Sequence, residues 1–126
     1  MKNIMIYVLT ILGFVILSAV VEMTSYTLFQ VPAPAGFGPK DLVLMFPPRI
    51  LLAFIFIFMF RLSAGSKLVE NGPLYGLLWF LGFSIPAEVG MLLVFKYGVI
   101  TFYAGLLSGL LTFLSWGWIV KNIKLP

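Results

Sequence analysis

The chain has no cysteine and no histidine among its 126 residues. Their absence excludes disulfide bonds, thiol redox chemistry, zinc or iron sites built from Cys and His, and haem ligated by histidine. It also excludes the nucleophilic machinery in which a histidine activates a serine or a cysteine. We therefore predict that the protein is not an enzyme, binds no metal ion and carries no cofactor.

Charged residues are also scarce. Only 10% of the residues are charged and 62% are hydrophobic, and a soluble domain of this length could not bury so much apolar surface. The eight basic and four acidic side chains give a formal net charge of +4. Most basic residues flank apolar segments, where they contact lipid headgroups. We therefore predict a membrane protein whose partner is the lipid bilayer and not a nucleic acid.

Four apolar segments are each long enough to span a bilayer, which needs about 20 residues. They predict an all-α membrane protein with a single four-helix transmembrane domain over residues 1–126. The first apolar run is longer than the core of a signal peptide, so we interpret it as a retained helix. The helices are predicted at about 4–29, 42–62, 73–95 and 98–120, with an outer loop rich in Pro and Gly at 30–41.

The start of the second helix is ambiguous. Asp41 could cap a helix that begins at Leu42, and the preceding residues 30–40 are predicted to be non-helical because of their prolines and glycines. Pro47 and Pro48 then interrupt the segment. We favour a long helix from Leu42 that kinks at the two prolines, since a helix from Pro47 would be short for a span. In the alternative, Leu42 to Phe46 forms a short segment at the membrane interface.

The basic residues predict the orientation of the chain. Only Lys96 and Tyr97 separate the third and fourth helices, which are therefore expected to form a tight antiparallel hairpin. Basic residues are enriched in cytoplasmic loops. We predict that both termini are cytoplasmic, in a multi-pass protein of a bacterial or archaeal cytoplasmic membrane, with Trp116 and Trp118 in the cytoplasmic aromatic belt. The residues predicted on the cytoplasmic side are Lys2, Arg61, Lys67, Lys121 and Lys124, against Lys40 and Lys96 outside.

Three charged residues fall within the predicted spans, where charges are costly and usually mark a site. Glu22, Arg49 and Glu88 each lie seven residues from an outer helix end, a depth of about 10 Å. A guanidinium between two carboxylates fits this buried charge layer, which could exchange a proton, accept a cation or bind a headgroup. In the alternative, Glu22 and Arg49 lie at the interface and Glu88 is the only buried charge. An ion pair could also serve only to fix the helix register.

Small side chains form a continuous stripe along the fourth helix, and small residues let membrane helices approach closely. We predict that this stripe is a helix-packing face, which would serve packing within the chain, oligomerisation or docking on a larger complex, or the lining of a pore. The third helix has a second stripe, Gly82, Pro86 and Gly90, and Pro86 is expected to kink it as Pro47 and Pro48 kink the second. The stripe on the fourth helix comprises Gly98, Thr101, Gly105, Ser108, Thr112 and Ser115.

These features favour two functions of different kinds. The first is a structural or accessory subunit of a larger membrane assembly, because the loops are short and no catalytic motif is present. The second is a small oligomeric transporter or channel for protons or ions that uses Glu88 with Glu22 and Arg49. An intramembrane enzyme acting on lipid through paired carboxylates is a further alternative. Lipid or pigment binding is another alternative. Besides the bilayer, the predicted partners of the protein are other membrane subunits or copies of the same chain.

Overall fold

The computed structural model describes residues 2–32, 36, 38–95 and 98–123, and every regular element among them is helical. Four stretches are long and apolar enough to cross a membrane, which confirms an all-helical protein with four candidate spans. The predicted connection Lys96–Tyr97 lies outside the described residues. The elements are α1 (Lys2–Leu28), α2 (Pro39–Leu44), α3 (Phe46–Leu62), η1 (Lys67–Val69), α4 (Gly72–Trp79), η2 (Phe80–Ser84), α5 (Ile85–Phe95) and α6 (Val99–Asn122).

The second span begins earlier than predicted. Helix α2 starts at Pro39, so the prediction that residues 30–40 contain no helix is wrong at Pro39 and Lys40. Proline suits the first turn of a helix, because its missing N–H would have no partner there. Asp41 does not cap the helix from outside. It lies in the first turn, where its carboxylate accepts a 2.7 Å hydrogen bond from the backbone N–H of Gly38.

The helical path breaks at Met45, two residues before the proline pair begins at Pro47. Helix α2 ends at Leu44 and α3 begins at Phe46, and the two together form one candidate span, Pro39–Leu62. Pro47 and Pro48 cannot donate backbone hydrogen bonds to the carbonyls one turn before them, which accounts for an interruption at this point. The backbone N–H of Met45 still bonds the carbonyl of Asp41 at 3.2 Å, so the helical direction continues.

The third span contains a π-helical turn. The segment η2 (Phe80–Ser84) separates α4 from α5, and the N–H of Ile85 bonds the carbonyl of Phe80, five residues earlier. Pro86 follows at once and leaves the carbonyl of Gly82 without its helical partner. A π turn is a recognised way to accommodate such an interruption, and these turns often lie at functional sites.

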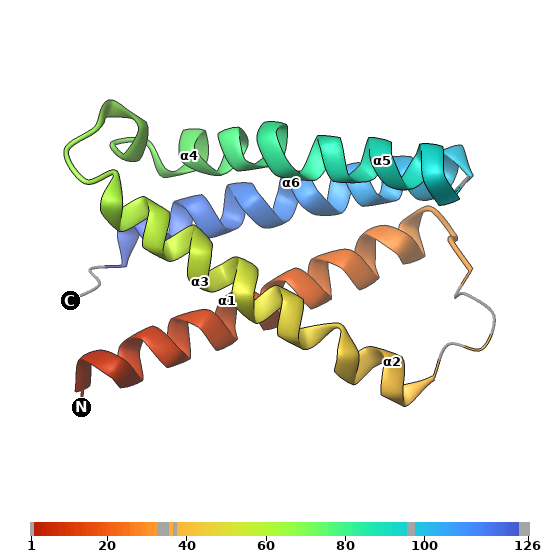
Figure 1. Cartoon of the computed structure of the whole chain (residues 1–126), viewed down its shortest axis with the longest axis horizontal. Coiled ribbons are helices and arrows are strands. Elements are labelled where there is room, and N and C mark those ends of the chain that lie inside the picture. Colours follow the sequence, from red (N-terminus) through yellow and green to blue (C-terminus); the bar gives the residue numbers. More distant parts are fainter. Residues whose placement is uncertain (1, 33–35, 37, 96–97, 124–126) are drawn as a thin grey trace.

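Helices α4 and α6 are in close backbone contact through glycine. A Cβ atom on Gly76 would overlap the carbonyl group of Phe113, and one on Gly117 would lie 3.0 Å from the backbone nitrogen of Gly76. Gly72 meets Gly117 in the same way. In Figure 1, α4, η2 and α5 run alongside α6 over nearly its whole length. Backbone contact of this kind maximises dispersion where lipid offers no hydrophobic driving force.

The other two spans cross each other. Figure 1 shows α1 and α3 as the arms of an X, so that they diverge on both sides of the crossing. The rings of Phe14 and Phe56 pack edge to face near the crossing, 6.1 Å apart. Because the arms diverge, the bundle has one opening on each side of this contact, and the two openings have different chemistry, as described below.

An aromatic cluster fills the centre of the bundle and joins the two helix pairs. The Trp116 ring stacks on Phe14 at 5.0 Å, and its indole Nε1–H donates a 3.0 Å hydrogen bond to the Phe14 carbonyl. Trp116 is only 1% exposed, so the prediction that it lies in an aromatic belt is wrong, whereas Trp118 is 59% exposed. The Tyr75 hydroxyl donates to the carbonyl of Phe56 at 2.6 Å. Both polar groups of these large rings are therefore satisfied inside the bundle.

Candidate functional site: a polar pocket between four spans

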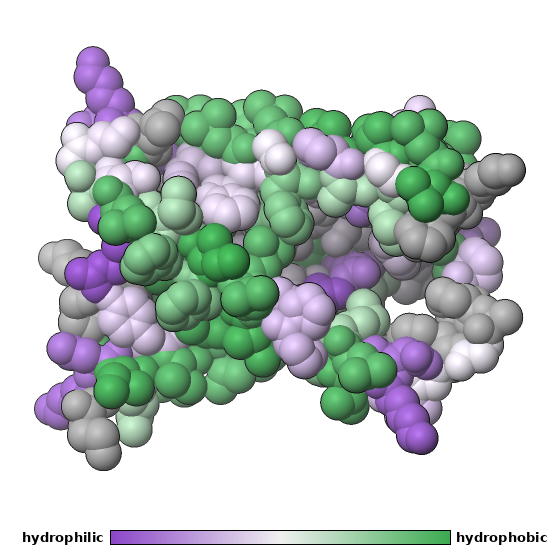
Figure 2. Space-filling model, in the orientation of Figure 1, coloured by the Kyte–Doolittle hydropathy of each residue, from purple (hydrophilic) through white to green (hydrophobic). Residues whose placement is uncertain are grey.

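A pocket of about 150 Å³ lies on the side of the α1–α3 crossing away from the two termini. Residues of all four spans line it, and it contains the three charged residues that the sequence places inside spans, Glu22, Arg49 and Glu88. Figure 2 shows hydrophilic atoms at the bottom of a hollow in this part of the surface, which is otherwise mostly apolar. The hollow is the polar opening of the bundle.

Arg49 is held on α1 by two side chains. Its Nη2 is ion-paired with Glu22, and its Nη1 donates a 3.0 Å hydrogen bond to Ser18 Oγ. The Ser18 hydroxyl in turn donates to the Val15 carbonyl at 2.8 Å, so its oxygen is oriented to accept from the guanidinium. Ser18 and Glu22 are one helical turn apart and share a face. The side chains of Arg49 and Glu22 are 17% and 24% exposed, so the pair is mostly removed from the surroundings.

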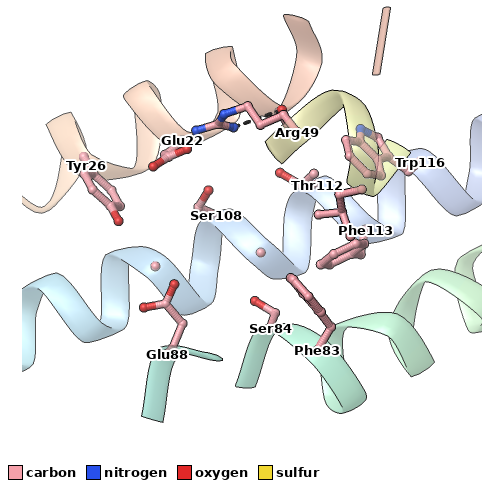
Figure 3. Close-up of a pocket in the computed structure, with 14 residues that line it drawn as sticks. Glu22, Tyr26, Arg49, Phe83, Ser84, Glu88, Ser108, Thr112, Phe113 and Trp116 are labelled. Atoms are coloured by element: carbon pink, nitrogen blue, oxygen red, sulfur yellow. Dashed lines mark hydrogen bonds and ion pairs between the residues drawn. The ribbon is translucent and has the colours of Figure 1, made fainter. Parts of the chain in front are cut away.

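Glu88 lies on the other side of the pocket, in the first turn of α5. Figure 3 shows its carboxylate directed toward α6, with the Arg49–Glu22 pair on the other side of that helix in this view. Within the described part of the chain, Glu88 has no ion pair. Its carboxylate packs on the Cα of Gly105, where a Cβ atom would overlap both carboxylate oxygens. A side chain at position 105 would therefore displace the Glu88 carboxylate from this place.

Hydroxyl groups lie between the two charged sides. Ser84 contacts Gly109 so closely that a Cβ on this glycine would lie 3.0 Å from the Ser84 Cβ and overlap its hydroxyl. Ser108 and Thr112, both buried on α6, point into the same space (Figure 3). The pocket therefore offers hydroxyl oxygens beside a carboxylate, which are ligands that a proton donor or a small cation can use.

Different parts of the small-residue stripe of α6 lie in different surroundings. Gly105, Ser108 and Thr112 line the pocket, Thr101 and Ser115 are half-buried, and Gly98 is exposed. The close backbone contacts of α6 are instead with α4, at Phe113 and Gly117. The second stripe does not face the bundle, since no atom lies within 4 Å of a Cβ built on Gly82 or Gly90.

Sequence reasoning did not identify the aromatic part of the pocket. Tyr26, Phe83, Phe113 and Trp116 also line it. Tyr26 lies one helical turn after Glu22, so its spacing from a charged residue was a usable signal. Phe83 is adjacent to Ser84, and adjacent residues do not share a helix face, so spacing gave no signal for it. No comparable signal marks Phe113 or Trp116, because each reaches the pocket only through the way α6 packs against its neighbours.

The charges of the pocket define what it can bind. Glu22 and Arg49 neutralise each other, and Glu88 adds one further negative charge when ionised, so the formal charge is −1. Among the described residues no group of three acidic side chains could hold a metal ion. A single carboxylate with hydroxyl neighbours is a weak site for a divalent metal ion but suits a proton or a monovalent cation.

No family model, no curated protein and no solved structure matches this chain.

Proposed function

We propose that the protein is a small membrane transporter that carries a proton or a monovalent cation on Glu88. One observation supports this above the others. Glu88 places a carboxylate in a polar pocket at membrane depth, with no ion-pair partner among the described residues. Ionisable groups in such positions are costly to maintain, and proton relays and ion pathways are among the functions that they mark.

The roles of the three charged residues differ in this proposal. Arg49 and Glu22 are positioning residues, because their ion pair ties α3 to α1 beside the pocket. Glu88 is the binding residue. A proton or cation on its carboxylate would remove the remaining charge of the pocket, and the hydroxyls of Ser84 and Ser108 would complete the ligand shell.

The pocket is closed toward the ends of the bundle that carry the termini. Phe14, Phe56, Phe113 and Trp116 form contiguous ring contacts across the centre, with centroid separations from 5.0 to 6.1 Å. Among the described residues, these rings separate the polar pocket from the apolar opening on the other side of the crossing. A closed side favours a carrier that exposes its site alternately over an open channel. The π turn η2, which ends at Ser84, is the natural place for the third span to bend.

The orientation follows from the basic residues. We propose that both termini face the cytoplasm of a bacterial or archaeal cell, which places the pocket in the outer half of the membrane. The start of α1, the end of α3, η1 and the end of α6 lie at one end of the bundle (Figure 1). By these bounds, that end carries Lys2, Arg61, Lys67 and Lys121 with one acidic residue, Glu70.

Flux through reconstituted vesicles tests the proposal. The purified protein is placed in liposomes that hold a pH-sensitive dye, and proton or cation gradients are imposed one at a time. We expect proton or monovalent cation movement well above that of protein-free liposomes made in parallel. Equal rates in the two preparations, with the protein shown to be folded and inserted, would contradict the proposal.

A second candidate is an accessory subunit of a larger membrane assembly. The outer face of η2 and α5 favours it, because no atom lies within 4 Å of a Cβ built on Gly82 or Gly90, and the neighbouring Leu81 and Val89 are exposed. Such a surface suits a helix of another subunit or of a second copy. The native mass after extraction in mild detergent distinguishes these cases. A heteromeric mass supports the accessory role, a homo-oligomer supports an oligomeric transporter, and a monomer contradicts both kinds of assembly.

A further inference from the structure

The second opening of the bundle is an apolar groove with an arginine at its mouth. It lies between α1 and α3 on the side of their crossing where both termini lie, and its volume is about 480 Å³. Its walls include Tyr7 and Ile11 of α1 and Phe54, Ile57 and Phe58 of α3. Arg61 stands at the end of α3, with its Cζ 5.8 Å from the centre of the Tyr7 ring.

The spacing of these residues gives the groove a direction. Phe54, Ile57, Phe58 and Arg61 follow i, i+3, i+4, i+7 spacing and share one face of α3. Arg61 is in the last turn of the helix, and Phe54 lies seven residues deeper, about 10 Å along the axis. The charged group therefore lies at the membrane surface, and the apolar walls extend from it into the bilayer.

Water is a poor occupant of this space. The volume would hold more than ten water molecules at about 30 Å³ each, but most of the wall is aliphatic or aromatic and offers few hydrogen-bond partners. An acyl chain needs no such partners. At the mouth, the guanidinium of Arg61 matches the geometry of a phosphate group, which arginine can bind with two parallel hydrogen bonds.

The surrounding charge selects the sign of the headgroup. Lys2, Lys67 and Lys121 lie at the same end of the bundle as Arg61, against Glu70 alone among acidic residues. Basic residues near a membrane surface attract anionic lipids, with about 1 kcal/mol for each Lys or Arg. The groove is thus apolar where a chain would lie and electropositive where a headgroup would lie.

We propose that the groove between α1 and α3 binds one anionic phospholipid, with an acyl chain along Ile11, Phe54 and Phe58 and its phosphate at Arg61. The lipid would fill the opening that the crossing of α1 and α3 creates on this side. It would hold the two helices in their diverging arrangement. This site is separate from the Glu88 pocket and does not depend on the transport proposal.

Native mass spectrometry of the protein in detergent with equal amounts of phosphatidylglycerol and phosphatidylethanolamine tests this proposal. We expect the wild-type protein to retain one phosphatidylglycerol in preference to phosphatidylethanolamine. Arg61→Gln should weaken retention of phosphatidylglycerol about tenfold, as for the loss of a charged hydrogen bond. Lys67→Gln is the matched control, since it removes one basic charge from the same end but not from the groove. It should weaken retention clearly less than Arg61→Gln, because only the general attraction of one surface charge is lost.

Two further variants keep the proposal testable if Arg61→Gln folds poorly. Arg61→Lys keeps the charge without the planar fork and should give intermediate retention. Ile11→Trp fills the groove and should reduce retention of phosphatidylglycerol while Arg61 remains. Equal retention of the two lipids by the wild-type protein, equal losses in Arg61→Gln and Lys67→Gln, or a lipid-free dimer closed over the groove would each overturn the proposal.

Discussion

Arg49 is fixed to α1 by both of its terminal nitrogens, one ion-paired with Glu22 and the other bonded to Ser18 Oγ at 3.0 Å. This contact joins α1 to α3 on one side of their crossing and forms one wall of the polar pocket. The arginine therefore stabilises the pocket without being available to neutralise Glu88. The basis of the proposed function is that one carboxylate of the pocket, Glu22, is ion-paired, whereas Glu88 has no ion pair among the described residues.

Replacing one member of this pair should destabilise the fold more than replacing both. Glu22→Gln leaves the Arg49 guanidinium mostly buried without its counter-charge, and we expect the free energy of unfolding to fall by about 3 kcal/mol. The double variant Glu22→Gln with Arg49→Gln should recover part of that loss. The free energy of unfolding is measured by reversible unfolding in detergent for the wild type, both single variants and the double variant. A coupling energy near zero would show that the ion pair does not support the fold.

Helix α4 should not tolerate a side chain at Gly76. A Cβ there would lie 2.7 Å from the carbonyl carbon of Phe113, a backbone atom that cannot move away cheaply. We expect Gly76→Ala to lower the free energy of unfolding by about 1–3 kcal/mol through overpacking. Gly82→Ala on the same span is the matched control, since no atom lies within 4 Å of its added Cβ. Equal effects of the two substitutions would contradict the close contact of α4 with α6.

The two tryptophans near the end of α6 should behave differently. Trp116→Phe removes the donor to the Phe14 carbonyl and leaves a gap in the aromatic cluster, so we expect a loss of about 1–3 kcal/mol in stability. Trp118→Phe changes an exposed ring and should cost well under 1 kcal/mol. Thermal unfolding of both variants in one detergent measures the difference, and the prediction fails if Trp118→Phe is the more damaging.

The absence of cysteine makes the proposed orientation easy to test. Single-cysteine variants at Pro32, before α2, and at Ala64, after α3, place one thiol on each side of the membrane, and both positions are exposed. With a membrane-impermeant maleimide added to intact cells, we expect Pro32→Cys to be labelled and Ala64→Cys to be labelled only after lysis. The reverse pattern would place the termini outside.

The sequence was sufficient for the four spans and for the residues at which they break. Apolar length predicts spans directly, and proline removes a defined backbone donor, so breaks near Pro47 and Pro86 could be expected. The predicted start of α2 was wrong because a proline can either end a helix or occupy its first turn. Pro39 ends no helix here but begins one, and only the contact between Asp41 and the N–H of Gly38 distinguishes the cases.

The sequence was not sufficient for the pairing of the helices. Periodicity shows which residues share a face but does not name the helix opposite, so the contact of Gly76 with Phe113 was missed although both glycines of α4 are visible in the sequence. Trp116 was misplaced for the same reason, since a tryptophan near a helix end suits either an interface or a core. Depth placed Glu22, Arg49 and Glu88 near one another, but which carboxylate pairs with Arg49 is decided by helix rotation.

The most direct test of the central claim is to measure proton or cation flux into liposomes that contain the Glu88→Gln variant. The substitution keeps the size of the side chain and removes its charge, and Glu70→Gln, at an exposed carboxylate outside the spans, is the matched control. We predict that Glu88→Gln, folded and inserted as well as the wild-type protein, moves protons and cations no faster than protein-free liposomes, whereas Glu70→Gln retains wild-type flux. Undiminished flux in Glu88→Gln would contradict the account.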